Sequence, residues 1–269
     1  MQLSQQQHSF FDTFGYLVFS ELFSSAEIAE ITAAFEITIR EFGGGDHDGS
    51  QRTMFLGPIE SHPTLCALLD DARIQAIVGA ILGADFNYAC GDGNYYSGDT
   101  GWHADGNWGE LFACKIAFYL DPLGRDSGCL RVIPGSQRPD HFIRTEGISP
   151  RQSLELYGVE AADFPGNIAL ETQPGDLVIF NHDLYHASFG GGQRRRMFTM
   201  NLTRGCRSAD DVEKFHNYVR VHTPGGYKID TGAGMFRPTL LDTASEARMI
   251  HLQKGVEIHD KLFPHLARK

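Results

Sequence analysis

Between residues 86 and 204 the chain is a series of short apolar segments separated by turn-forming residues. The segments are FNYAC, LFACKIAFYL, CLRVIPG, NIALET, DLVIF and MFTMNL, and the sequences between them include GDG, DPLGRDSG, PGSQRPD, QPGD and FGGGQ. Short strands with such turns indicate a β-sandwich or a double-sheet jelly roll rather than alternating βαβ units. LFACKIAFYL is almost continuously apolar, so we expect it near the middle of a sheet.

Helical patterns flank this β region on both sides. The clearest is Ala26–Phe42, where apolar residues recur at helical spacing behind an N-cap at Ser24 or Ser25. The other expected elements are helices at Ser4–Phe14, at about 63–82 and at Thr243–His259, a strand at 15–19 and a polar loop at 43–49. We predict one domain over 1–269, mainly β with flanking helices: a helical part (about 1–84), a cupin-like jelly-roll core (about 85–204) and a C-terminal extension (about 205–269).

Composition limits the classes of partner. Acidic residues outnumber basic ones by 34 to 23, which gives a formal charge of −11 and disfavours nucleic acid and anionic membranes as partners. The five cysteines are irregularly spaced and form no CxxC pair, which argues against a disulfide framework or a zinc ribbon. The N-terminal sequence lacks the pattern of a signal peptide. We expect a soluble cytoplasmic protein that acts on a small molecule; its oligomeric state stays open.

Three residues in the β region have the spacing of a metal site. His103 and Asp105 are two apart on an extended segment, so their side chains project to the same side. His186 follows the turn and strand PGDLVIF. Two imidazoles and one carboxylate bind one face of an octahedral ferrous ion and leave the other face open. We interpret His103, Asp105 and His186 as the catalytic iron ligands, although a His-x-Asp pair alone is also typical of a surface loop.

Each of the more distant candidates has a rival nearby. His182 could replace His186 as the third ligand, but the small residues Ala187 and Ser188 beside His186 leave more room for a bound cofactor. Arg195 could bind the far carboxylate of a 2-oxo acid, because its guanidinium is a permanently charged planar fork. Strand alternation puts Arg195 on the polar face of its segment and Arg196 on the apolar face. If this segment borders a cavity inside the fold, Arg195 is the arginine expected to face the cavity. If the segment is instead a solvent-exposed basic turn, neither arginine would bind a ligand.

Four segments, in the same order along the chain, resemble the phytanoyl-CoA dioxygenase (PhyH)-like Fe(II)/2-oxoglutarate oxygenase family. They are FFDTFGYLVFSELFSSAEIAEI, GWHADG, SGCLRVIPGSQ and GDLVIFNHDLYHASFGGGQRRRMF, and the resemblance extends from about residue 9 to 204. It implies a double-stranded β-helix fold with His103, Asp105 and His186 around Fe(II). It also implies that Ser188 and Arg195 bind 2-oxoglutarate. The connection SFGGGQ is shorter than in many members, which keeps Arg196 open as the alternative.

The resemblance also implies a reaction. Fe(II), 2-oxoglutarate and O2 would together hydroxylate a small molecule, with release of succinate and CO2. Asp105 argues against a halogenase, in which a small residue replaces this carboxylate; desaturation stays open. Two further alternatives are a cupin-like metal-dependent hydrolase or isomerase that does not use 2-oxoglutarate, in which Arg195 would be dispensable, and a noncatalytic metabolite-binding relative.

The residues that would contact the primary substrate are the least determined. Candidates are chosen because they flank the proposed ligands or lie on the central strand: Asn94, Tyr96, Asn107, Trp108 and Lys115. A lysine inside an apolar strand needs a partner or a function, so Lys115 predicts either an anionic substrate or an ion pair with a nearby carboxylate. Whether the substrate is a CoA ester is left open.

Overall fold

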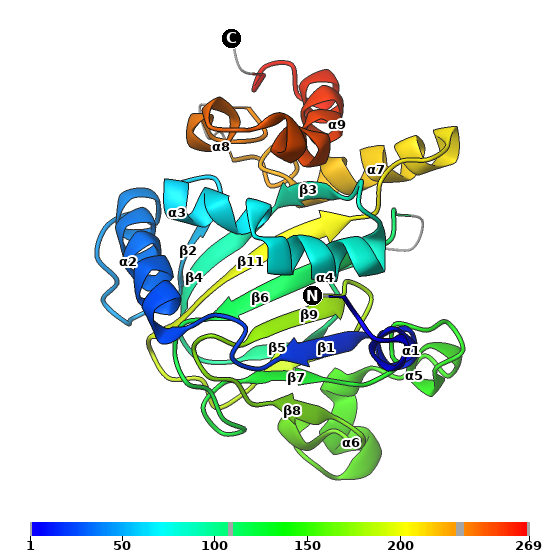
Figure 1. The fold of residues 1–269 in the computed structure, drawn as a ribbon. Coiled ribbons are helices and arrows are strands. Elements are labelled where there is room, and N and C mark those ends of the chain that lie inside the picture. The colour runs from blue at the N-terminus through cyan, green and yellow to red at the C-terminus, as the bar shows by residue number, and fades with distance from the viewer. Residues whose placement is uncertain (1, 107–109, 230–233, 268–269) are drawn as a thin grey trace.

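The strands of the computed structural model form two antiparallel sheets (Figure 1), and the structure describes residues 2–106, 110–229 and 234–267. The larger sheet has the order β1-β9-β6-β11-β4-β2, with β3 also paired to β11, and the smaller has the order β5-β10-β7-β8. The larger sheet contains β1 (Tyr16–Phe19), β2 (Thr53–Leu56), β3 (Asn87–Cys90), β4 (Asp92–Tyr96), β6 (Ala113–Tyr119), β9 (Leu177–Asn181) and β11 (Arg195–Thr203). The smaller contains β5 (Thr100–His103), β7 (Leu130–Val132), β8 (Ile168–Leu170) and β10 (His186–Ser188). The jelly-roll prediction is confirmed, and so is the central place of LFACKIAFYL, which contains β6.

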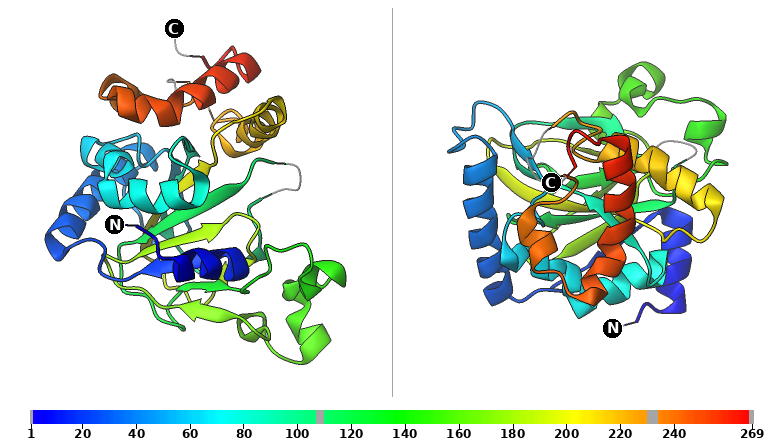
Figure 2. Two further views of the ribbon diagram at one scale, coloured as in Figure 1. Left: turned by 45° about the vertical axis from the view of Figure 1, so that its right-hand side comes forward. Right: turned by 90° about the horizontal axis from the view of Figure 1, so that it is seen from above.

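Helices cover one face of the larger sheet (Figures 1 and 2). They are α2 (Ser25–Phe42), α3 (Pro63–Cys66), the 3-10 turn Ala67–Asp70 and α4 (Ala72–Leu82), while α7 (Ala209–His222), α8 (Pro238–Asp242) and α9 (Glu246–Leu262) lie beyond β3. The short α5 (Phe142–Thr145) and α6 (Ser153–Tyr157) lie beside the smaller sheet, and α1 (Gln5–Phe14) beside β1. Among the described residues, no helix combines the length and apolarity needed to cross a membrane.

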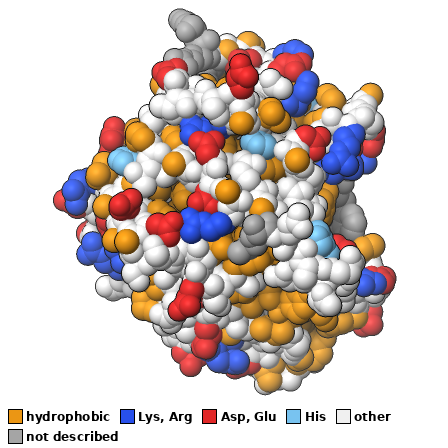
Figure 3. Space-filling model, in the orientation of Figure 1, with side chains coloured by type: hydrophobic (Ala, Val, Ile, Leu, Met, Phe, Trp, Pro, Cys, Tyr) orange, Lys and Arg blue, Asp and Glu red, His pale blue; other side chains and the backbone are white. Residues whose placement is uncertain are grey.

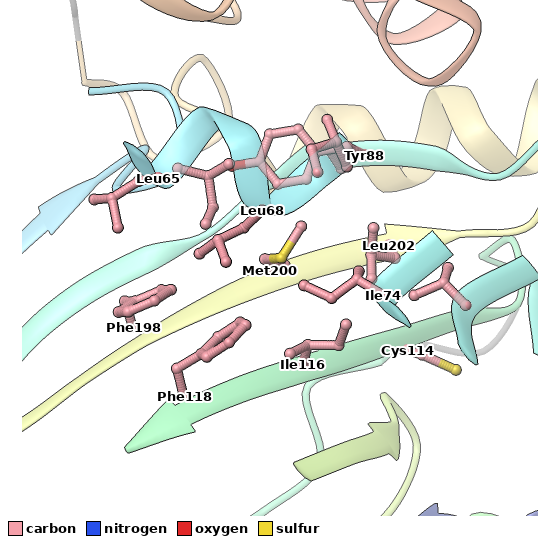
Figure 4. Packing of buried hydrophobic residues seen from close by; sticks show 14 of the residues in the cluster. Leu65, Leu68, Ile74, Tyr88, Cys114, Ile116, Phe118, Phe198, Met200 and Leu202 are labelled. Atoms are coloured by element: carbon pink, nitrogen blue, oxygen red, sulfur yellow. The ribbon is translucent and has the colours of Figure 1, made fainter. Parts of the chain in front are cut away.

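The main core lies between these helices and the larger sheet. Figure 4 shows Leu65, Leu68 and Ile74 of the helical layer facing the side chains of β6 and β11. Phe198, Met200 and Leu202 of β11 are fully buried there. The intervening residues Met197, Thr199 and Asn201 line a cavity on the other side of the sheet. The two faces of β11 therefore differ as strand alternation predicts.

The predicted N-terminal helices form with the expected caps. Ser24 accepts from the Glu27 backbone N–H while Glu27 accepts from the Ser24 backbone N–H, a reciprocal capping box at the start of α2. The side chains of Ile28, Ile31, Phe35 and Ile39 are buried as the helical spacing predicts.

Two differences from the expected elements have local causes. The helix expected over 63–82 is interrupted at Asp71, whose extended backbone and carboxylate cap α4 by accepting from the N–H groups of Arg73 and Ile74. Helix α7 was not predicted, because its buried face (Phe215, Tyr218, Val219 and His222) is mixed with acidic and basic residues. Figure 3 shows one face of the whole molecule, on which Lys and Arg side chains lie among Asp and Glu side chains.

Candidate metal centre

Pairing of two strands in the smaller sheet brings the distant histidines together. His103 ends β5 and His186 begins β10, and these residues are direct antiparallel partners. Asp105 lies two residues past His103, where its N–H and that of Gly106 each donate to the His182 carbonyl at 2.9 Å. Potential ligand atoms of His103, Asp105 and His186 all lie within 4.8 Å of one another. Among the residues that the structure describes, this is the one group of His, Cys, Asp or Glu side chains close enough together to hold a metal ion.

The hydrogen bonds of the two imidazoles direct one nitrogen of each toward Asp105. His103 Nδ1 lies 2.8 Å from the Gly101 carbonyl and His186 Nδ1 lies 2.9 Å from the Leu184 carbonyl. Each Nδ1 therefore carries the proton and donates, which leaves Nε2 with a free lone pair. These Nε2 atoms lie 3.6 Å and 3.5 Å from the carboxylate oxygens of Asp105. Ligands at about 2.1 Å from one ion are separated by roughly 3 Å or more, so the arrangement fits a divalent cation.

The electrostatics of the site also favour metal binding. Burial lowers the pKa of His186 to about 4, so its imidazole is neutral at pH 7. Burial alone would raise the pKa of Asp105, but the ammonium of Lys115 together with the neighbouring histidines His186 and His182 outweighs burial and holds this pKa well below its usual range. Lys115 Nζ lies 2.6 Å from Asp105 Oδ2. Neutral imidazoles and an ionised carboxylate are the ligand forms that a metal requires.

A cavity of about 520 Å³ extends from these residues between the two sheets and reaches Arg195 and Ser188. Arg195 is only 5% exposed; its Nη1 donates to the Gly128 carbonyl at 2.5 Å and its guanidinium lies 4.8 Å from the Tyr96 ring centroid. Arg195 Nε and Ser188 Oγ are buried and have no hydrogen-bond partner among the described residues. Leaving buried polar atoms unpaired is costly. A guanidinium and a hydroxyl in this state fit a carboxylate ligand.

The neighbouring arginine lies on the other side of the sheet. Arg196 binds the Asp121 carboxylate through Nε at 3.0 Å and through Nη2 at 2.5 Å, and its Nη1 donates to Glu36 at 2.9 Å. Arg196 is thus ion-paired with both Asp121 and Glu36. The structure places Arg195 in the cavity and Arg196 beneath α2.

His182 does not join the metal group. Its side chain is buried beside α7, with Nε2 3.5 Å from the Tyr218 hydroxyl and the ring centroid 5.7 Å from that of His222. Burial lowers the pKa of His182 to about 3. The contribution of His182 to the site is therefore its backbone carbonyl, which holds the segment at Asp105.

The substrate candidates are distributed unevenly. Tyr96 and Lys115 line the cavity, whereas Asn94 is fully buried behind its wall. Asn107 and Trp108 lie outside the described residues. Lys115 forms the ion pair with a nearby carboxylate that was one of its two predicted roles.

Sequence reasoning missed part of the cavity wall. Arg52, Asp92 and Tyr227 also line it, although no local motif marks them and they come from three separate parts of the chain. Only the pairing of β2 with β4 brings Arg52 and Asp92 to one wall.

Comparison with known proteins gives consistent matches. Residues 11–197 match the family phytanoyl-CoA dioxygenase (PhyH). An ectoine dioxygenase of Sphingopyxis alaskensis is 25% identical, over 70% of this chain and 71% of that protein.

Solved structures of similar fold include two with 2-oxoglutarate bound. EctD from S. alaskensis with 2-oxoglutarate and 5-hydroxyectoine is 22% identical with a TM-score of 0.57, covering 75% of this chain and 76% of that one. HygX from Streptomyces hygroscopicus with nickel, 2-oxoglutarate and hygromycin B is 15% identical with a TM-score of 0.59, covering 78% and 93%. At these identities the structural likeness establishes a common fold.

Proposed function

The chain belongs to the phytanoyl-CoA dioxygenase family, and from this premise we propose that the cavity at His103, Asp105 and His186 hydroxylates a small molecule. The chain is a 2-oxoglutarate-dependent non-haem iron dioxygenase. One observation carries the proposal for its site: a two-histidine, one-carboxylate group shares a single cavity with a buried arginine whose Nε has no partner in the described chain. The residues present fit both an iron ion and a 2-oxo diacid.

His103, Asp105 and His186 would hold Fe(II), with Nε2 of each imidazole and a carboxylate oxygen as ligands. When bound with 2-oxoglutarate and O2, the iron supplies the oxidising power that replaces a substrate hydrogen by hydroxyl, while 2-oxoglutarate is converted to succinate and CO2. The hydrogen bonds from Nδ1 to the carbonyls of Gly101 and Leu184 fix the orientation of both rings before the metal arrives.

Lys115 serves as a positioning residue in this proposal. Its ammonium donates to Asp105 Oδ2, which is the oxygen 3.5 Å from His186 Nε2. This hydrogen bond fixes the orientation of the carboxylate that would hold the ion. An anionic substrate is therefore not needed to account for a lysine within β6.

Arg195 and Ser188 would bind the distal carboxylate of 2-oxoglutarate. The planar fork of Arg195 can donate two parallel hydrogen bonds to a carboxylate, and the hydroxyl of Ser188 can donate a third. Tyr96 packs against the guanidinium and limits its movement. A hydrolase or isomerase that does not use 2-oxoglutarate would leave these unpartnered donors without a purpose.

The primary substrate is proposed to be a small polar molecule. Among the similar proteins, the ectoine dioxygenases are named for a small molecule, and one structure of HygX contains hygromycin B. The cavity of about 520 Å³ has both charged and apolar walls, which suits a molecule of that kind. All five cysteines are free thiols, so we place the enzyme in the reducing cytoplasm.

An anaerobic titration of the Fe(II)-loaded protein with 2-oxoglutarate tests the proposal. We expect the weak visible metal-to-ligand charge-transfer band of an iron-bound 2-oxo acid. Arg195→Gln should weaken 2-oxoglutarate binding by on the order of tenfold or more, because a charge-assisted pair to a carboxylate is lost. His186→Ala should abolish the band.

Arg196→Gln is the matched control, since it removes the adjacent arginine from the opposite face of the same strand. It should leave the affinity for 2-oxoglutarate unchanged. Iron binding without any band in the wild-type protein would contradict the 2-oxoglutarate proposal. An effect of Arg196→Gln equal to that of Arg195→Gln would contradict the assignment of Arg195.

A further inference from the structure

We propose that Arg52 is the binding site for a carboxylate group of the primary substrate. This inference rests on the proposed function, since it concerns a molecule that enters the cavity beside iron and 2-oxoglutarate. It narrows the substrate class from small polar molecules to small carboxylic acids.

Arg52 and Arg195 are packed against the same aromatic ring. The guanidinium carbon of Arg52 lies 4.2 Å from the Tyr96 ring centroid, and that of Arg195 lies 4.8 Å from it. The two arginines differ in access: Arg195 is 5% exposed, whereas the side chain of Arg52 is 40% exposed. Both line the cavity. The cavity thus has one guanidinium at a buried position suited to the cosubstrate and a second on its solvent side.

Neighbouring side chains hold Arg52 in place. Its Nε donates to Asn94 Oδ1 at 2.7 Å, and its Nη2 donates to Asp92 Oδ2 over a longer 3.3 Å. Nη1 has no acceptor among the residues that the structure describes. The guanidinium is therefore fixed on Tyr96 while part of its fork is free for a ligand, and such preorganisation lowers the cost of binding.

Asp92 supports Arg52 and is not itself available to a ligand. Its Oδ1 accepts from Thr199 Oγ1 at 2.6 Å, and its Oδ2 accepts from Asn94 Nδ2 at 2.5 Å as well as from Arg52. Both oxygens are thus engaged within the wall. Of the two charged side chains at this point of the cavity, only Arg52 can gain a strong contact with substrate.

The charges of the described lining residues favour an anionic substrate. Among the residues that the structure describes, the charged side chains lining the cavity are the cations Arg52, Lys115 and Arg195 and the carboxylates Asp92 and Asp105, which leaves one net positive charge when the histidines bind the metal as neutral ligands. A ferrous ion and the dianion of 2-oxoglutarate cancel each other. The loaded cavity therefore keeps one positive charge, which a single carboxylate on the substrate would neutralise.

Neither a purely structural ion pair nor a phosphate ligand fits the contacts of Arg52 as well. An ion pair with Asp92 alone would be made through one long contact at a partly exposed site, where such pairs contribute little. A phosphate group, such as those of a CoA ester, would bring more negative charge than the loaded cavity has in excess. A carboxylate matches both the single fork and the single charge.

The test uses the full protein loaded anaerobically with Fe(II) and saturating 2-oxoglutarate. Butyrate, cyclopentanecarboxylate and phenylacetate are titrated, each beside its own primary amide, with coenzyme A as the phosphate probe. Binding is read from the change in the charge-transfer band. We expect at least one acid to bind on the order of tenfold or more tighter than its amide, and coenzyme A to have no effect.

Arg52→Gln should remove the preference for acid over amide while keeping the band, and Arg52→Lys should restore part of the preference. Arg194→Gln is the control, because Arg194 stacks on the neighbouring ring of Tyr95 at 5.2 Å and does not line the cavity. The inference is overturned if amides bind as well as acids, if none of the three acids perturbs a band that does form, if coenzyme A binds in their place, or if Arg52→Gln keeps the preference. Absence of the band itself would instead overturn the proposed function.

Discussion

The two faces of the larger sheet have the same strands but opposite chemistry. On the face covered by helices, Phe198 and Met200 pack against apolar neighbours and leave no room for a ligand. On the cavity face, Thr199 and Asn201 of the same strand lie among charged and polar side chains. On the cavity side, Ser188 Oγ, Arg195 Nε and Asn201 Oδ1 are buried without a hydrogen-bond partner among the residues that the structure describes.

This difference separates stability from function within one sheet. Apolar burial supplies most of the free energy of folding, so changes on the helix-covered face should unfold the protein. Changes on the cavity face should leave it folded and remove ligand binding. Each prediction below tests one side of that division.

The largest effect is expected for Asp105→Ala. Removing the only carboxylate of the three proposed ligands should lower turnover of 2-oxoglutarate by on the order of a thousandfold or more, because the iron loses a ligand. Turnover is measured as succinate formed, and folding by circular dichroism. Wild-type turnover in this variant would disprove the ligand assignment.

Phe198→Ala tests the opposite face of the same sheet. Phe198 is fully buried and stacks on Phe118 with ring centroids 4.6 Å apart. Its truncation should lower the free energy of unfolding by about 3–5 kcal/mol, measured by urea denaturation. The fraction that remains folded should bind Fe(II) with wild-type affinity. If metal binding is lost while stability is retained, the division between the two faces fails.

Acid should destabilise the metal-free protein through buried histidines. Burial lowers the pKa of His182 from 6.5 to about 3. The unfolded chain therefore takes up a proton at higher pH than the folded one, so this contribution to stability is complete above pH 6.5 and is lost as pH falls toward 3. His182→Asn should show a shallower decline of the unfolding free energy with falling pH; an unchanged decline would contradict the prediction.

Lys115→Met is expected to have the smallest of these effects, a loss of affinity for the metal ion. Without the ammonium at Asp105 Oδ2, affinity for Co(II), used as a spectroscopic stand-in for Fe(II), should fall about tenfold. Lys115→Gln, which can still donate a hydrogen bond, should recover part of the affinity and of the wild-type Co(II) absorption spectrum. Arg52→Gln removes a cation from the same cavity without touching Asp105 and serves as the control. Equal Co(II) affinity in all three variants would show that Lys115 does not position the ligand.

Local sequence determined the features that depend on periodicity and on turn chemistry. The alternation in RRMFTMNL already separated Arg195 from Arg196, and the apolar run LFACKIAFYL indicated a central strand, because the side-chain period of a strand is fixed by its backbone. The helix α2 was predictable from its spacing and its serine cap for the same reason. The His-x-Asp spacing alone indicated that two side chains can face one point.

Only the tertiary structure decided which residues from different parts of the chain share that point. Pairing of β5 with β10 puts His103 opposite His186, and pairing of β2 with β4 brings Arg52 onto Tyr96. The partner of Lys115 was one of two possibilities until the fold placed Asp105 2.6 Å away. Periodicity describes how a segment divides its side chains between two faces, whereas an ion pair or a ligand site depends on which strands become neighbours, and that is set by the packing of the whole chain.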